Sequence, residues 1–99
     1  MQTISKRAYE EVFHTHNFRR TDGKGWLASD ETLSSPSVIV QDAVGETQTA
    51  MVSDVSVVSE IYVKYKLKGG TSGSQYTILI RAESSAGNKF EDALTLDIE

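Results

Sequence analysis

Residues 61–98, IYVKYKLKGGTSGSQYTILIRAESSAGNKFEDALTLDI, decide the fold of this chain. Apolar and polar residues alternate along three runs of this stretch, 61–68, 75–84 and 88–98, and glycine-rich turns separate the runs. Strict alternation predicts strands with one buried and one solvated face, because successive side chains of a strand point to opposite sides. The stretch therefore predicts a meander of three consecutive antiparallel strands.

The short turn at residues 85–87 sets the register of the last two strands, because Gly87 suits the left-handed position of a three-residue hairpin loop. A shift by two residues would oppose Glu83 to Glu91, two like charges. The register also places Asp92 on the buried face opposite Ile80, where we expect a hydrated position near a rim; a ligand role is the alternative. The predicted pairs are Glu83 with Lys89, Arg81 with Glu91, Thr77 with Thr95, Ala82 with Phe90, Ile78 with Leu94, and Tyr76 with Leu96.

Composition and charge exclude several classes of function. The chain has 99 residues, no cysteine and a net charge of −4 at pH 7. A nucleic-acid module would show a concentrated basic surface, and disulfides or thiolate chemistry would need cysteine. Residues 1–10 lack the apolar core of a signal peptide, and no run approaches the about 20 apolar residues of a membrane span. The absence of cysteine fits cytoplasmic synthesis, and we expect no nucleic-acid partner and no membrane span.

The first half of the chain adds shorter strands to the meander. Residues 1–7 have little to bury and predict a flexible tail, so residues 8–99 form the single predicted domain. An edge strand is expected at 12–18, and Pro36 predicts a strand start or an edge ahead of Val38, because proline lacks a ladder donor. Two short pieces, 49–52 and 55–58, follow. About seven short strands at this spacing predict a β-sandwich.

The segment GGTSGSQY, residues 69–76, resembles the E–F corner of immunoglobulin-like domains, where a tyrosine hydroxyl bonds to the backbone just upstream. The resemblance implies an all-β, immunoglobulin-like β-sandwich of about seven antiparallel strands. Gly69, Gly70 and Tyr76 would form its structural corner. The chain has no cysteine pair, and its one tryptophan, Trp26, precedes the strand that would be strand B. The resemblance is therefore to immunoglobulin-like domains in general and not to antibody domains.

A second resemblance concerns three short motifs: WLASDETL at 26–33, GGTSG at 69–73 followed by Tyr76, and SAG at 85–87. Together they are similar to small modules of tailed-phage and prophage structural proteins of the fibre-like or head–tail type. The resemblance spans about residues 12–98 and implies a non-enzymatic virion component that binds other virion proteins. It brings no catalytic residues. The alternative function is a carbohydrate-binding or adhesive domain of a bacterial surface protein, with a glycan as partner.

Four residues are the candidates for partner binding. Lys64, Lys66 and Lys68 share one side of the predicted strand at 61–68. They serve solubility, block edge pairing, or bind an acidic partner. Trp26 either closes one end of the fold or lies exposed for contact with a protein or a sugar, as aromatic anchors of binding surfaces do.

The residues for catalysis or metal binding are incomplete. His14 and His16 share one strand face, a spacing that can hold Zn²⁺, but a competent site needs a third ligand and the sequence offers only generic carboxylates. A solvated strand face is the alternative interpretation. The serines lie outside any Gly-x-Ser-x-Gly motif, and the loop at 69–73 is not followed by the Lys-Ser/Thr of a phosphate loop. We therefore expect no enzyme activity, no metal and no cofactor.

Overall fold

The computed structural model describes residues 2–18 and 32–99, and this part of the chain contains seven strands and one short 3-10 helix. The strands are β1 (Gln2–Lys6), β2 (Val12–Asn17), β3 (Leu33–Gln41), β4 (Val52–Val58), β5 (Tyr62–Leu67), β6 (Gln75–Ser84) and β7 (Lys89–Ile98), and the helix is η1 (Thr49–Met51). The prediction of an all-β protein with about seven strands is confirmed for these residues.

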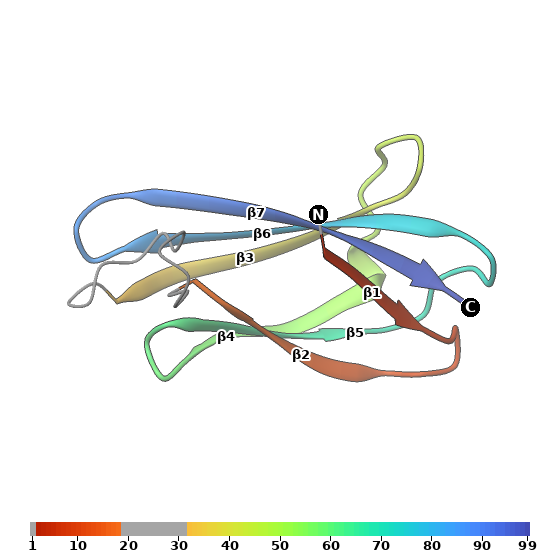
Figure 1. Cartoon of the computed structure of the whole chain (residues 1–99), viewed down its shortest axis with the longest axis horizontal. Coiled ribbons are helices and arrows are strands. Elements are labelled where there is room, and N and C mark those ends of the chain that lie inside the picture. The colour runs from red at the N-terminus through yellow and green to blue at the C-terminus, as the bar shows by residue number, and fades with distance from the viewer. Residues whose placement is uncertain (1, 19–31) are drawn as a thin grey trace.

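The strands form two sheets, which Figure 1 shows as two layers. One sheet has the order β1–β7–β6–β3 and the other the order β2–β5–β4. Side chains from both sheets are buried in one hydrophobic cluster, in which the largest fully buried members are Tyr65, Phe18, Leu67, Ile78, Ile80, Leu96, Val40 and Val63. Complete burial of one such aliphatic side chain stabilises the fold by about 1.5–3 kcal/mol relative to exposure.

The predicted register of the last hairpin is confirmed. All six predicted pairs occur between β6 and β7, and Asp92 lies opposite Ile80. Gly87 has φ +88°, and the N–H of Ser84 donates to the carbonyl of Asn88 at 2.8 Å, which closes a loop of three residues. Ile78 and Ile80 are fully buried, so the apolar side of the hairpin faces the core as the alternation predicted.

The prediction of a three-stranded meander is wrong in one respect, because β5 and β6 lie in different sheets. Strand β5 pairs with β4 and β2, and its alternate residues Val63, Tyr65 and Leu67 are buried against the other layer. The connecting loop turns the chain from one layer to the other through Gly69 and Gly70, which have φ +63° and +95°. A Cβ at residue 70 would lie 2.8 Å from the Ile98 side chain, so the close approach also requires glycine there.

The segment predicted as a flexible N-terminal tail instead contains strand β1. It pairs with β7 in parallel, with Gln2 opposite Leu94 and Lys6 opposite Ile98, so the prediction of only antiparallel strands is corrected as well. The N–H of Glu99 donates to the carbonyl of Lys6 at 2.8 Å. The physical reason is the edge of β7, whose backbone N–H and C=O groups would be unpaired without β1. Residues 2–6 contain few apolar side chains, so their own pattern did not indicate a strand.

The remaining strands combine confirmed and corrected predictions. Strand β2 is an edge strand as predicted, and Pro36 lies on the edge strand β3 within a register irregularity between Ser34 and Ser37, where a missing donor is tolerated. The two predicted pieces at 49–52 and 55–58 are instead η1 followed by one continuous strand, β4. Asp54 has φ +56° at an irregularity in that strand, which explains the break in its alternation.

Candidate partner-binding site

The outer face of the sheet β2–β5–β4 carries an exposed aromatic ring between two lysines. Phe13 is 50% exposed, and the ammonium groups of Lys64 and Lys66 lie 4.5 and 5.4 Å from the centroid of its ring. We call these three residues the basic face. Because a cation is attracted to the face of an aromatic ring, the lysines hold Phe13 in a defined position at the surface.

Local alternation explains why Phe13 is on the outside. In β2 the side chains of Val12, His14 and His16 point toward the core side, so Phe13 and Thr15 point to solvent. The pairing places Phe13 opposite Lys66, which brings the ring beside the lysine stripe. Sequence reasoning predicted the stripe but missed Phe13, although the alternation of the neighbouring Val12 and His14 was a signal that could have found it.

Charge on this face is only partly compensated. The Lys66 ammonium lies 3.6 Å from the Glu11 carboxylate, and 27% of the Lys66 side chain and 57% of the Glu11 side chain are exposed. An ion pair with this exposure stabilises a protein by at most about 1 kcal/mol, so either partner is available for exchange. Lys68, the third predicted candidate, is half-buried where the chain leaves β5, and its N–H donates to the carbonyl of Met51 at 2.8 Å.

The predicted corner residues follow Lys68, in the loop after β5 and at the start of β6. The N–H of Thr71 donates to the hydroxyl oxygen of Tyr76 at 3.0 Å, and the Tyr76 side chain is buried among core residues. Hydrogen bonds from the side chain and the backbone of Thr71 lower the pKa of Tyr76, because they favour the phenolate. The loop between Gly69 and Tyr76 is thereby tied to the first residues of β6.

Trp26, the fourth candidate for partner binding, lies outside the described residues. The candidate face is therefore built from β2 and β5 alone.

The two histidines do not lie on a solvated strand face, contrary to the alternative interpretation of the sequence. They point to the core side of β2, and the Nε2 atom of His16 lies 3.1 Å from Oδ2 of Asp92 on β7, which bridges the two sheets. Asp92 thus occupies the predicted face, with the histidine as a neighbour that the sequence did not predict. Among residues 2–18 and 32–99, no group of three potential ligands could hold a metal ion.

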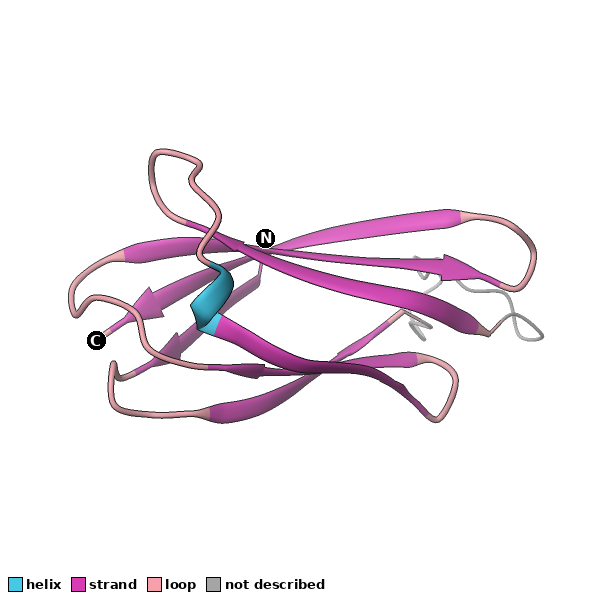
Figure 2. Cartoon of the chain, turned by 180° about the vertical axis from the view of Figure 1, so that it is seen from behind, coloured by secondary structure: helices cyan, strands magenta, loops and turns pink. Residues whose placement is uncertain are grey.

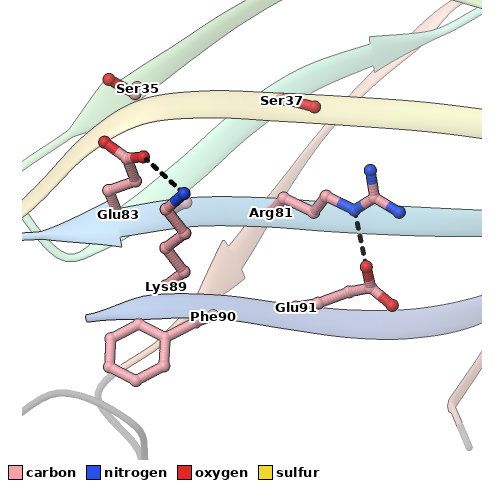
Figure 3. Close-up of a pocket in the computed structure, with 8 residues that line it drawn as sticks. Ser35, Ser37, Arg81, Glu83, Lys89, Phe90 and Glu91 are labelled. Atoms are coloured by element: carbon pink, nitrogen blue, oxygen red, sulfur yellow. Dashed lines mark hydrogen bonds and ion pairs between the residues drawn. The ribbon is translucent and has the colours of Figure 1, made fainter.

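The outer face of the other sheet has a shallow hollow of about 280 Å³ (Figure 3). Arg81 Nε lies 2.6 Å from Glu91 Oε2, and Lys89 Nζ lies 3.9 Å from Glu83 Oε1. Figure 3 shows both pairs running across β6 and β7, with Ser35 and Ser37 on the neighbouring β3. The charged groups that line the hollow are paired with one another across the strands. Their role is therefore to stabilise the register of β6 and β7.

A comparison with protein families decides among the functions left open by this geometry. The family model described as podophage GP4 fiber-tail adaptor protein gp77 matches residues 10–97. The chain belongs to this family. It is thus a phage fibre–tail adaptor, a structural and non-enzymatic component of the virion tail that binds other virion proteins.

Membership in the adaptor family confirms the predicted class of virion structural protein. A search of curated proteins finds no match to this chain. In the described part of the adaptor, no helix is long and apolar enough to cross a membrane. A protein that joins two virion parts acts through its surfaces, so the exposed aromatic and charged residues described above are its candidate functional groups.

Proposed function

We propose that the adaptor binds one of its virion neighbours through the basic face. The observation that carries this proposal is Phe13, half exposed and held beneath the ammonium groups of Lys64 and Lys66. Aromatic rings with a fixed position are efficient anchors, because they bury a large apolar area and lose little conformational freedom on binding.

The chemistry of the partner follows from the charge on this face. The chain has a net charge of −4, yet this surface presents two ammonium groups beside an apolar ring. A complementary surface would place carboxylates opposite the lysines and an apolar depression opposite the ring. Such charge complementarity steers encounter and selects the partner. We therefore propose an acidic surface on the fibre or tail protein as the partner.

Binding of the adaptor to the purified fibre and tail proteins of the same phage tests the proposal. We expect Phe13→Ala to weaken one of the two interactions by about tenfold or more, the cost of a central aromatic anchor. The double variant K64E/K66E should weaken the same interaction further, and its dependence on salt should be lost. Lys89→Ala is the matched control, because Lys89 lies exposed on the other sheet. Unchanged affinities for both variants would contradict the proposal.

We also propose an immunoglobulin-like β-sandwich that forms a single domain. If the strands are lettered A to G in chain order, the order β2–β5–β4 becomes B–E–D and the order β7–β6–β3 becomes G–F–C. Immunoglobulin domains place B, E and D in one sheet and C, F and G in the other. The first strand departs from the constant-type arrangement, because it pairs with G in parallel. The Tyr76 hydrogen bond supports a role for Gly69, Gly70 and Tyr76 as the structural corner.

The other predicted features remain proposals. Synthesis in the bacterial cytoplasm before incorporation into the virion, and an origin in a phage or a prophage, agree with an adaptor function. The alternative of a carbohydrate-binding surface depends on Trp26, and no observation on the described residues favours it. Glycan binding that is lost in Trp26→Ala would support that alternative.

A further inference from the structure

The turn between β1 and β2 displays a tyrosine that has almost no contact with the rest of the protein. Tyr9 is 96% exposed, the largest exposed fraction among the large hydrophobic residues that the structure describes. Its ring therefore contributes little to the fold. A single exposed aromatic residue is common on protein surfaces, so the case for Tyr9 as an anchor depends on how its turn is held.

The turn that carries Tyr9 is held in place by a buried lysine. The Lys6 ammonium donates to the carbonyls of Arg7 at 2.8 Å, Glu10 at 2.9 Å and Gly69 at 2.6 Å. Lys6 is only 3% exposed, and these three bonds use all three of its donors. Within the turn, the N–H of Arg7 donates to Oε1 of Glu10 at 2.7 Å. Because its neighbours on both sides are tied down, Tyr9 is presented on a preorganised turn, which reduces the entropy cost of binding.

A second preorganised turn lies at the same end of the molecule and displays Val44, which is 82% exposed. The Oδ1 atom of Asp42 accepts the N–H groups of Val44 at 3.0 Å and Glu46 at 2.9 Å, and Oδ2 accepts from Gln48 at 3.1 Å. A hollow of about 350 Å³ lies between residues 42–44 and the start of β6. Figures 1 and 2 show this loop, the β1–β2 turn and the β5–β6 loop at one end of the two layers.

The charge at this end is opposite to that of the basic face. The carboxylates there are Glu10, Asp42, Glu46 and Glu99, and the bases are Lys6, Arg7 and Lys68. Lys6 does not present its charge to solvent, because carbonyl oxygens surround its ammonium. We call residues 6–10, 42–46 and 68–74 together with Glu99 the acidic end. The exposed charge of this end is negative, with Glu10 next to Tyr9 in the chain, whereas the basic face presents ammonium groups beside an apolar ring.

We propose that the acidic end is a second docking surface of the adaptor, anchored by Tyr9, and that its partner is a virion protein with an apolar pocket and a basic rim. The proposal rests on the proposed function, since it assigns the two partners of an adaptor to two surfaces of opposite charge. A protein that bridges fibre and tail must bind both at once, which requires two surfaces that do not overlap. The basic face lies on the side of one sheet and the acidic end lies at the end of the two layers, and Glu11, which pairs with Lys66, marks the border between them.

The test uses the full chain and two probes, the purified fibre protein and the purified tail protein of the same phage. We expect Tyr9→Ala to weaken binding to one of them by about 30-fold, as for an aromatic hot spot, and Phe13→Ala to weaken binding to the other. The unfolding midpoint of Tyr9→Ala should equal that of the parent chain, because the ring has almost no contacts to lose. Tyr9→Phe, which keeps the ring, should bind within a few-fold of the parent.

Glu10→Gln tests the charge separately, because the amide oxygen can still accept the Arg7 N–H while the negative charge is lost. We expect a several-fold weaker affinity for the partner that Tyr9→Ala affects, and a flatter dependence on salt. Affinities for both proteins that stay within twofold in Tyr9→Ala would overturn the proposal. It would also fail if Tyr9→Ala and Phe13→Ala weakened only the same protein, since the surfaces would then be one.

Two further outcomes separate this proposal from the preceding one. An effect of Tyr9→Ala with none of Phe13→Ala would leave the acidic end supported and the basic face refuted. A chain that sediments as an oligomer, and that Tyr9→Ala converts to a monomer with fibre and tail binding unchanged, would identify a second copy as the occupant and overturn the assignment to a virion protein.

Discussion

The β6–β7 hairpin and strand β2 place different kinds of side chain in the space between the sheets. The hairpin places aliphatic side chains such as Ile78 and Leu96 inside and charge pairs outside. Strand β2 places His14 and His16 on the inner side and leaves Phe13 half exposed on the outer side. The hairpin thus follows the pattern expected for stability, and β2 departs from it.

The difference shows where stability and function are located. A polar side chain on the inner face of a strand, or an apolar one on the outer face, lowers stability. Such departures concentrate at functional sites. The departure in β2 places the aromatic ring of the basic face at the surface. Its counterpart is a pair of imidazoles in the interior, of which His16 approaches Asp92 across the sheets. Inward polar groups of the hairpin have partners as well: the Tyr76 hydroxyl accepts a backbone N–H, and Asp92 lies against His16.

Truncation of a core residue in the hairpin should have the largest effect. Leu96 is fully buried, and Leu96→Ala should lower the free energy of unfolding by about 2–5 kcal/mol, the cost of lost transfer energy and of the cavity left behind. Urea denaturation measures this difference. The matched change on β2, Phe13→Ala, should cost about 1 kcal/mol or less, because it removes only exposed contacts with the lysines. Equal costs for the two variants would break the comparison.

Removal of the partly buried imidazole at residue 14 should have a smaller effect than Leu96→Ala, with the opposite sign. Among the described residues, the Nε2 atom of His14 is buried without a hydrogen-bond partner, a situation that costs about 1–3 kcal/mol. His14→Leu should therefore raise the free energy of unfolding by about 1 kcal/mol at pH 7.5, once the poorer fit of the new side chain is included. A lower stability of the variant would show that the imidazole is satisfied by water.

The same variant should also change the pH dependence of stability. Burial lowers the pKa of His14 from its usual value of 6.5, so the folded protein takes up this proton only at a lower pH than the unfolded chain does. The stability that depends on an unprotonated His14 is therefore fully present above pH 6.5, and it is lost as the pH falls from there through the folded-state pKa. The parent chain should become less stable relative to His14→Leu over this window, as urea midpoints at pH 7.5 and 5.5 would show.

An effect similar in size to that of His14→Leu, but opposite in sign, is expected at the start of the hairpin. Tyr76→Phe removes the acceptor of the Thr71 N–H and keeps the ring, so it should cost about 0.5–1.5 kcal/mol, the net contribution of one hydrogen bond. Thermal and urea unfolding of the two proteins measure the difference. An unchanged midpoint would count against the corner role of Tyr76 and would show that water replaces the hydroxyl.

The sequence by itself determined the hairpin. Alternation assigned Ile78, Ile80 and Leu96 to the core, and the charges of Glu83 and Glu91 together with Gly87 selected one register. These features depend on residues close in the chain, because a two-residue side-chain period and a three-residue loop leave few alternatives. The class of phage structural protein was also predicted, from three short motifs.

Only the tertiary structure decided how the sheets are composed and which surfaces they present. The parallel pairing of β1 with β7, and the placement of β5 in the sheet of β2, join segments far apart in the sequence whose own patterns do not name a partner. Phe13 meets Lys64 and Lys66 only because β2 pairs with β5. Lys6 meets Gly69 only because of this pairing and that of β1 with β7. Contacts between distant residues depend on the whole packing arrangement, whereas periodicity reports only on the local face of one strand.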